Sequence, residues 1–220
     1  MRQSVHIIRA GINCVLVRGE SGSVLVDTGH RSARPRLMNG LASAGFRPDE
    51  ALTVILTHGD TDHTGSAHYL KETFGATLAA HRAEAGVLDR GDMTRSRKER
   101  PDRMPWIFRA LLPISFLFWR SDPVTLDLTL EDGQSLASFG VDGTILHLPG
   151  HSRGSIVILL PTGELVCGDL LWNMRRPRMH PLIDDMEPAR ASIARIRELP
   201  VTTLVPAHGQ PFSTEELTAI

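Results

Sequence analysis

The order of apolar runs and helical segments along this chain predicts an α/β fold. Short runs typical of buried strands alternate with segments of helical spacing, a pattern that favours helices outside a sheet over an all-β barrel. The chain has 220 residues, 41% hydrophobic content and a formal net charge of −1, as expected for one soluble domain with a substantial core. This net charge gives no sign of the excess of basic residues that is typical of nucleic-acid-binding proteins. We therefore expect a single α/β domain over residues 1–220.

Strands dominate the start of the chain. Residues 5–8, 12–17 and 24–26 are apolar runs, and a G-E-S-G turn at residues 19–22 joins the last two as a hairpin. The hairpin ends at Asp27. For this residue we expect a structural role, as a turn former or as an acceptor that fixes a neighbouring loop, rather than metal ligation.

Helices and strands then alternate. Residues 34–44 and 66–74 have apolar side chains at helical spacing, and each segment is followed by a glycine that stops a helix. The predicted strand at residues 52–56 lies between the two helices, and the predicted strand at residues 77–80 follows the second helix. This alternation is the main support for the α/β prediction.

An insertion interrupts the pattern at residues 90–123. Residues 90–103 are rich in arginine, and in residues 106–119 Arg109 is the only charged side chain. The apolar part is too short to cross a bilayer and is broken by Pro113. Three interpretations stay open: a lid over an active site, a homodimer surface, and a peripheral membrane contact. We favour lid or dimer over membrane.

The second half is again rich in strands. One helix is expected, at residues 187–199, with Pro188 in its first turn. The predicted strands are residues 126–130, 144–148, 156–160, 164–166 and 202–205.

The strongest chemical signal is the T-H-G-D-T-D-H-T-G segment at residues 57–65, directly after a buried strand. His58, Asp60, Asp62 and His63 follow one another at intervals of two, two and one, so no single helical face could present all four. A loop leaving a strand could wrap them around one or two metal ions. The alternative, a polar turn with a helix N-cap at its end, would account for only one of the four.

Three other strand ends carry a histidine or an aspartate. They are His151 in P-G-H-S, Asp169 in C-G-D and His208 in P-A-H-G. Each is weak evidence alone, because an isolated histidine is more often a surface or hydrogen-bonding group. Together with residues 57–65 they supply four histidines and three carboxylates, enough for two metal ions that share a bridging ligand.

The order H-x-D-x-D-H, G-H-S, G-D and A-H-G, with an early D-T-G, resembles the metallo-β-lactamase superfamily over residues 5–212. The resemblance implies a four-layer αββα sandwich with a mono- or dinuclear metal centre along one edge. It implies one metal ion held by His58, Asp60 and His151, a second held by Asp62, His63 and His208, and Asp169 as the bridge.

Asp60 departs from the family pattern, which has histidine at this position. A carboxylate is a harder donor and adds negative charge, which lowers the preference for zinc relative to iron or manganese. It also resembles the diiron branch of the superfamily, which has glutamate there. We expect two divalent ions, with zinc as the first expectation and iron or manganese as the alternative because of Asp60.

The function implied is metal-dependent hydrolysis. A metal-bound hydroxide would attack an ester, lactone, thioester or related bond of a small molecule, and Asp62 would both ligate metal and orient the water. The apolar residues 106–119 suit a hydrophobic substrate. The alternatives are a diiron-type oxidoreductase and a non-catalytic metal-binding protein on the same fold. His30, His147 and His180 are further candidates for substrate contacts, but we expect them to be structural or exposed.

The two cysteines indicate a reducing environment. Cys14 and Cys167 lie in apolar runs without C-x-x-C spacing, so we expect reduced, buried thiols. Residues 5–8 already have the character of a strand rather than of a leader peptide. A cytoplasmic location is therefore expected.

Overall fold

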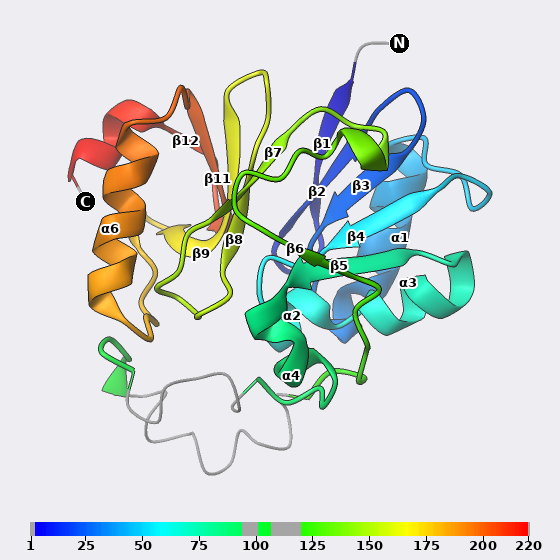
Figure 1. The fold of residues 1–220 in the computed structure, drawn as a ribbon, viewed down its shortest axis with the longest axis horizontal. Coiled ribbons are helices and arrows are strands. Elements are labelled where there is room, and N and C mark those ends of the chain that lie inside the picture. Colours follow the sequence, from blue (N-terminus) through cyan, green and yellow to red (C-terminus); the bar gives the residue numbers. More distant parts are fainter. Residues whose placement is uncertain (1–2, 94–100, 107–119, 220) are drawn as a thin grey trace.

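The computed structural model of the protein describes residues 3–93, 101–106 and 120–219. Within these residues two six-stranded sheets pack face to face, and helices cover their outer faces (Figure 1). Helices α1 (Arg34–Ser43) and α3 (Ala67–Phe74) cover one sheet, and α6 (Met186–Arg197) covers the other. This confirms the αββα sandwich that the resemblance implied.

The first sheet has the strand order β1-β2-β3-β4-β5-β6. Strands β1 to β3 are antiparallel, including the predicted hairpin, and β3 to β6 are parallel. Parallel neighbours need crossover connections, which α1 and α3 provide. The strands are β1 (Ser4–Arg9), β2 (Asn13–Arg18), β3 (Ser23–Val26), β4 (Leu52–Ile55), β5 (Thr77–His81) and β6 (Leu128–Leu130).

The second sheet has the order β12-β11-β9-β8-β7, and β10 pairs with β9. Helix α6 begins after Asp185, whose carboxylate accepts a hydrogen bond from the Glu187 amide, and Pro188 lies in its first turn as predicted. The strands are β7 (Thr144–His147), β8 (Ile156–Leu159), β9 (Glu164–Asn173), β10 (Arg178–Met179), β11 (Thr203–Gly209) and β12 (Phe212–Ser213). The short helices are η1 (Arg31–Ala33), α2 (Thr61–Thr64), η2 (Arg82–Glu84), α4 (Ala85–Leu88), η4 (Ala137–Phe139) and η5 (Thr214–Ala219).

The core has three apolar layers because strand side chains alternate between two faces. In β2, Val15 and Val17 belong to the cluster between the sheets, whereas Cys14 and Leu16 belong to the cluster under α1. A third cluster packs α6 against the second sheet and includes Cys167. Both thiols are buried and free, as expected, and burial raises the pKa of each.

Two strands are longer than the sequence predicted. The strands expected to end at residues 166 and 205 continue to Asn173 and Gly209, so Asp169 and His208 lie inside strands rather than in loops after them. Gly168 has a φ of +51°, and the pairing register between β9 and β11 shifts there. A glycine in a strand therefore marks a bulge here, not an end.

Residues 94–100 and 107–119 of the predicted insertion lie outside the described residues. The lid, homodimer and membrane interpretations therefore stay predictions. The described parts of the insertion contact the rest of the fold through the backbone. Asp92 and Arg120 form an isolated antiparallel β-bridge, and Arg103 exchanges backbone hydrogen bonds with Ile183. Trp106 is 78% exposed. Among the described residues, no helix combines the length and apolar character needed to cross a membrane.

Candidate metal centre

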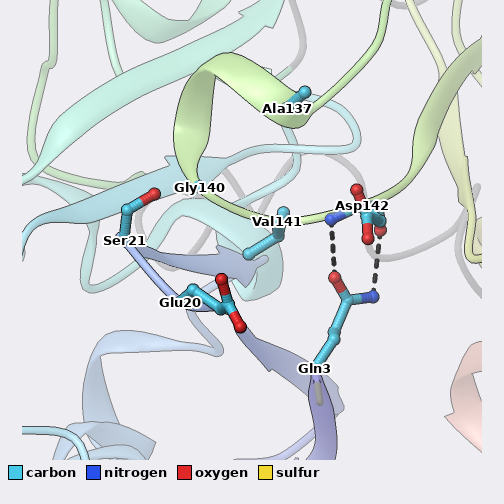
Figure 2. Close-up of a pocket in the computed structure, with 8 residues that line it drawn as sticks. Gln3, Glu20, Ser21, Ala137, Gly140, Val141 and Asp142 are labelled. Carbon is cyan, nitrogen blue, oxygen red and sulfur yellow. Dashed lines mark hydrogen bonds between the residues drawn. The ribbon is translucent and has the colours of Figure 1, made fainter. Parts of the chain in front are cut away.

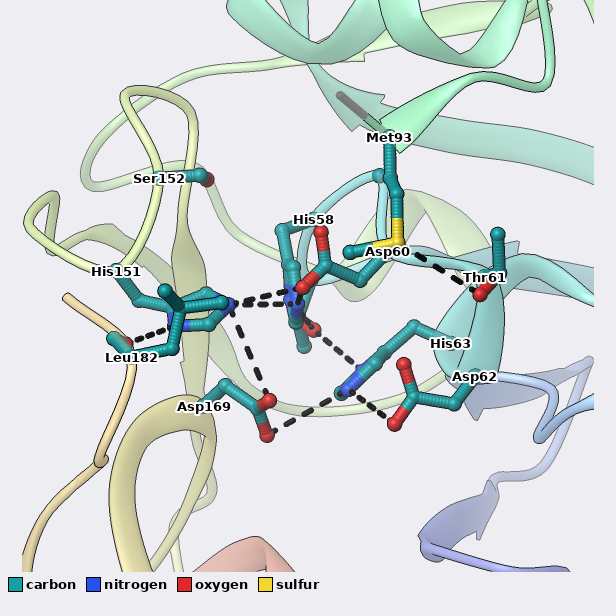
Figure 3. A network of polar contacts seen from close by, with 12 residues as sticks. His58, Asp60, Thr61, Asp62, His63, Met93, His151, Ser152, Asp169 and Leu182 are labelled. Atoms are coloured by element: carbon teal, nitrogen blue, oxygen red, sulfur yellow. Dashed lines mark hydrogen bonds and ion pairs between the residues drawn. The ribbon is translucent and has the colours of Figure 1, made fainter. Parts of the chain in front are cut away.

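The structure brings all seven predicted site residues together. Figure 3 labels each of them except His208. They form two sets whose nitrogen and oxygen atoms lie within 4.8 Å of one another in each set. We call them the His58 group and the His63 group. The His58 group is His58, Asp60, His151 and Asp169, and the His63 group is Asp62, His63 and His208.

The His58 group joins the loop after β4 to the loop after β7. Nε2 of His58 and Nε2 of His151 are 3.1 Å apart. Oδ2 of Asp60 is 3.2 Å from the His151 nitrogen and 3.4 Å from the His58 nitrogen. Three donor atoms from distant parts of the chain therefore point at a common position.

The His63 group joins the same β4 loop to strand β11. Oδ2 of Asp62 lies 3.2 Å from Nε2 of His208 and 3.9 Å from Nε2 of His63. Asp169 of the His58 group also approaches the His63 group, with oxygens 3.5 Å from both His63 and His208 and 3.9 Å from His151. The bridging role that the resemblance implied for Asp169 stays a prediction.

The Nδ1 atoms of three of these histidines are held by neighbours outside the cluster. Nδ1 of His63 is 2.8 Å from Asp27, and Nδ1 of His151 is 2.8 Å from the Leu182 carbonyl. Nδ1 of His58 is 3.0 Å from the Thr57 hydroxyl, which donates its own proton to Asp27. This network assigns the ring proton to Nδ1 and leaves the Nε2 lone pair directed into the cluster, as in metal-binding histidines.

Asp27 has the structural role that the sequence predicted. It follows β3, which is parallel to β4, and has a φ of +60°, a conformation that aspartate tolerates better than most residues. Its carboxylate accepts hydrogen bonds from the Thr57 amide at 2.8 Å and from His63. Asp27 thus anchors the loop that carries four of the seven site residues.

Asp60 faces the cluster rather than the helix that follows it. Helix α2 begins at Thr61, so Asp60 occupies the N-cap position, but its side chain makes no capping hydrogen bond. Its carboxylate contacts His58 and His151 instead. The polar-turn alternative for residues 57–65 therefore does not describe this segment.

Two buried atoms of the cluster face each other at 3.5 Å as an ion pair and form no hydrogen bond among the described residues. They are Nε2 of His63 and Oδ1 of Asp169. A buried polar atom without a partner is costly, so such atoms in a folded protein call for an explanation. A divalent cation between them would supply it, and imidazole nitrogens with carboxylate oxygens suit zinc, iron or manganese. The residues present therefore fit a metal centre.

Charges within the cluster move the pKa of several members. Burial lowers the pKa of His63 and His208, but neighbouring carboxylates outweigh it, so the pKa of His63 is raised and that of His208 reaches about 10. Burial raises the pKa of Asp62 and Asp169, yet the nearby histidines lower both below the ordinary value. Without metal, the carboxylates thus hold protons on the imidazoles.

His180, one of the further candidates named from the sequence, lies beside the cluster. We expected it to be structural or exposed, but it is buried, with Nε2 3.4 Å from Asp169. Its ring packs against those of His151 and Trp172 at centroid distances of 4.9 Å. No local pattern marks it, because it lies in an irregular segment after the short strand β10. His147 lies elsewhere, stacked on another histidine.

A cavity of about 430 Å³ opens beside the cluster. Its polar lining consists of His30, Asp60, Thr61, Asp62, Asp169, His180 and His208. Its apolar wall is formed by Met93, Trp172, Pro181 and Leu182. Four of the seven site residues and an apolar surface are therefore accessible from one space.

A second hollow, of about 510 Å³, lies between the N-terminal strands and η4 (Figure 2). The Gln3 side chain closes one side of it through two hydrogen bonds to the Asp142 backbone. The residues that line it include no histidine or cysteine. The catalytic chemistry is therefore expected at the first cavity.

Comparisons with known proteins agree with this geometry. Residues 8–208 match the family model described as "Metallo-beta-lactamase superfamily". The protein named acyl-coenzyme A thioesterase MBLAC2 of Gallus gallus is 31% identical over 66% of this chain and 52% of its own length. The protein of the same name from Bos taurus is 28% identical over 93% of this chain and 75% of its own length. The chain thus spans about half of the first relative and three quarters of the second.

Solved structures show the same fold. A HARLDQ-motif mutant of a metallo-beta-lactamase from Cronobacter sakazakii has a TM-score of 0.68 and 24% identity, covering 92% of this chain and 76% of that one. A subclass B3 metallo-beta-lactamase of Bradyrhizobium japonicum has a TM-score of 0.66 and 19% identity, covering 89% and 71%. At these identities the likeness concerns the fold alone.

Proposed function

The chain belongs to the metallo-beta-lactamase superfamily, and from this premise we propose that it is a metal-dependent hydrolase acting on an ester, lactone or thioester bond. The observation that carries the proposal is the convergence of seven imidazole and carboxylate side chains beside a cavity with an apolar wall. Scattered surface residues would not leave buried, unpartnered nitrogen and oxygen atoms aimed at one another.

In this proposal His58, Asp60 and His151 hold one divalent ion, and Asp62, His63 and His208 hold the other. Asp169, whose oxygens face histidines of both sets, would contribute to both ions. Divalent ions bound there supply Lewis-acid polarisation of a carbonyl and a lowered pKa for water, which is the chemistry hydrolysis needs. Because Asp60 replaces an imidazole by a carboxylate, zinc competes with iron and manganese more evenly than at a site with a third histidine.

Asp62 is proposed to orient the attacking water. Its side chain is 37% exposed, in contrast to the buried His63 beside it, and it lines the cavity. Neighbouring imidazoles lower its pKa, so the carboxylate is ionised at neutral pH and accepts a hydrogen bond from water. This is the catalytic role expected from the sequence.

His180 is proposed to contact the oxygen of the scissile group. Its Nδ1 lies 3.1 Å from the Leu182 amide and 3.0 Å from the Leu182 carbonyl, and the Asp169 carboxylate, 3.4 Å from Nε2, favours a proton on Nε2, on the side of the cavity. A donor held in this way stabilises negative charge that develops on a carbonyl oxygen.

Among the candidate substrates we favour an acyl thioester. Two of the relatives described above are named as acyl-coenzyme A thioesterases, and the cavity wall of Trp172, Pro181 and Leu182 would accept an acyl chain. Apolar contact along such a chain contributes roughly 25 cal/mol per Å² buried.

The test combines metal analysis with a substrate panel. Purified protein is assayed for bound metal and then for cleavage of acyl thioesters of increasing chain length, matched oxygen esters, lactones and a phosphodiester. We expect two divalent ions per chain and thioester cleavage that disappears on chelation and returns when metal is restored. Full turnover after verified metal removal, or no cleavage of any carbonyl substrate by the loaded protein, would refute the proposal. Oxygen consumption without hydrolysis would instead favour the oxidoreductase alternative.

A further inference from the structure

Glu84 contacts both of the loops that form the His58 group, and no metal assignment uses it. We propose that Glu84 is a positioning residue that ties these loops together and so sets the distance of His58 and Asp60 from His151. The inference rests on the proposed metal centre and adds a residue to it.

The carboxylate of Glu84 is fully buried and accepts three hydrogen bonds. Oε2 accepts from the Gly59 amide at 2.9 Å. Oε1 accepts from the Ser152 hydroxyl at 2.7 Å and from the Gly154 amide at 2.9 Å. Gly59 lies between His58 and Asp60 in the sequence, and Ser152 follows His151, so each oxygen holds one of the loops.

Both loops also approach Glu84 too closely for a side chain. A Cβ atom added to Gly59 would lie 3.0 Å from Oε2 of Glu84 and 2.6 Å from a methyl group of Val87. A Cβ atom added to Gly154 would lie 2.5 Å from Oε1. The two glycines are therefore needed where the loops pack on this carboxylate.

The topology explains why one residue can reach both loops. Glu84 follows β5, the parallel neighbour of β4, so it lies at the same sheet edge as the His58 loop. The Ser152 loop comes from the second sheet, between β7 and β8. Glu84 thus links the two halves of the sandwich at the metal centre. Asp27 anchors the β4 loop independently, within the first sheet.

Glutamine cannot reproduce these contacts. Its amide group would place N–H donors against either the Gly59 amide or the Gly154 amide, and neither backbone donor can turn round to accept. One loop would lose its anchor, while the hydrogen bond that Asp27 accepts from His63 would be untouched. The His58 group should therefore loosen more than the His63 group.

The experiment measures metal binding by the full chain without substrate. Zn²⁺ is titrated into metal-free wild type and Glu84→Gln in competition with a chromophoric chelator, and bound metal is counted by elemental analysis. For Glu84→Gln we expect one zinc equivalent to weaken by about 10- to 100-fold, the range found when groups that support metal ligands are removed. The other equivalent should stay within about threefold.

Asp127→Asn is the matched control. Asp127 also holds a backbone amide, that of Leu78 at 2.9 Å, but at the opposite end of β5. It should lower the thermal stability of the metal-free protein and leave both zinc affinities unchanged. If Glu84→Gln does not fold, Ser152→Ala removes one of the three donors and should weaken the same equivalent by a smaller factor.

The outcomes separate this inference from the proposed function. A wild-type chain that binds no divalent metal would remove the metal centre itself. The positioning role alone would be overturned if wild type binds two zinc ions and the folded Glu84→Gln variant either binds both with unchanged affinity or loses both equally. Selective loss of one equivalent in Glu84→Gln supports it.

Discussion

Oδ2 of Asp27 lies 2.8 Å from Nδ1 of His63, and both side chains are buried. The pair joins the ends of two parallel strands, because Asp27 follows β3 and the His63 loop follows β4. A carboxylate in this position keeps the histidine proton on Nδ1 and the lone pair of Nε2 directed into the cluster.

Asp27→Asn should therefore weaken metal binding by the His63 group. Asparagine tolerates the φ of +60° at this position, so the backbone should be retained. One of the two carboxylate oxygens, which serve the Thr57 amide and His63, becomes an N–H donor, and the negative charge is lost. We expect the affinity of one metal equivalent to fall by about 10- to 100-fold in a chelator competition. Asp49→Asn, which changes an exposed ion pair with Arg47, is the control and should have no effect. Unchanged affinity in Asp27→Asn would show that the pair is dispensable.

Asp60 should be a ligand that biases metal choice. Its Oδ2 lies 3.2 Å from Nε2 of His151, in the position of the family's histidine. Asp60→His should keep two metals bound and shift occupancy toward zinc when zinc competes with iron or manganese. Asp60→Ala should lose one equivalent. Elemental analysis after growth in defined metal mixtures provides the measurement, and identical metal content in all three proteins would show that Asp60 does not ligate.

His180 should affect turnover more than metal content. If it contacts the substrate oxygen, His180→Ala should lower kcat by about 100-fold, the usual effect of removing one donor to a developing negative charge. Both metals should remain, because the proposed ligand set does not include it. Parallel kinetics and metal analysis decide the matter: loss of a metal equivalent in His180→Ala would identify it as an eighth ligand instead.

The apolar cavity wall should determine preference for acyl-chain length. Leu182→Ala removes part of this wall, while the Leu182 carbonyl that holds His151 stays in place. We expect kcat/KM to fall for long-chain thioesters and to change little for acetyl thioesters, since each buried methylene contributes about 0.8 kcal/mol. Met174→Ala, an exposed residue outside the cavity, serves as control. Equal losses for short and long chains would place the acyl group elsewhere.

Metal should change how stability depends on pH. Without metal, the raised pKa values of His63 and His208 stabilise the fold fully below the unfolded value of 6.5, and this contribution is lost as the pH rises through the raised pKa values, of which that of His208 is about 10. The lowered pKa values of Asp62 and Asp169 stabilise it above the unfolded value of 3.8, and that contribution is lost as the pH falls. Between these values both contributions are present.

Bound metal must displace the histidine protons, so its stabilising effect should grow with pH. Tm of the metal-free protein should decline from pH 6.5 toward pH 9, and the difference between metal-loaded and metal-free Tm should widen over the same interval. Calorimetry in buffers of different ionisation enthalpy should record proton release on metal binding. A metal-free Tm that is flat across this interval would contradict the assigned ion pairs.

The sequence by itself determined the fold class and the identity of the seven cluster residues. Apolar runs alternate with helical spacing because parallel strands need crossover helices, so the α/β order is a local property of the chain. The carboxyl ends of parallel strands meet at one edge, so a dense H-x-D-x-D-H segment after such a strand already indicates where chemistry is concentrated. Even so, the local signal misplaced the ends of β9 and β11, because Gly168 has the composition of a turn and the geometry of a bulge.

Only the tertiary structure decided which residues support the cluster. Glu84 meets Ser152 across 68 positions of sequence, and His151 meets the Leu182 carbonyl across 31. His180 reaches Asp169 from an irregular segment without any periodic pattern. Local propensity predicts the backbone conformation of a residue from its neighbours in the sequence. Contacts of this kind depend instead on how two sheets pack and where their edge loops cross, and the packing of the whole core sets that arrangement.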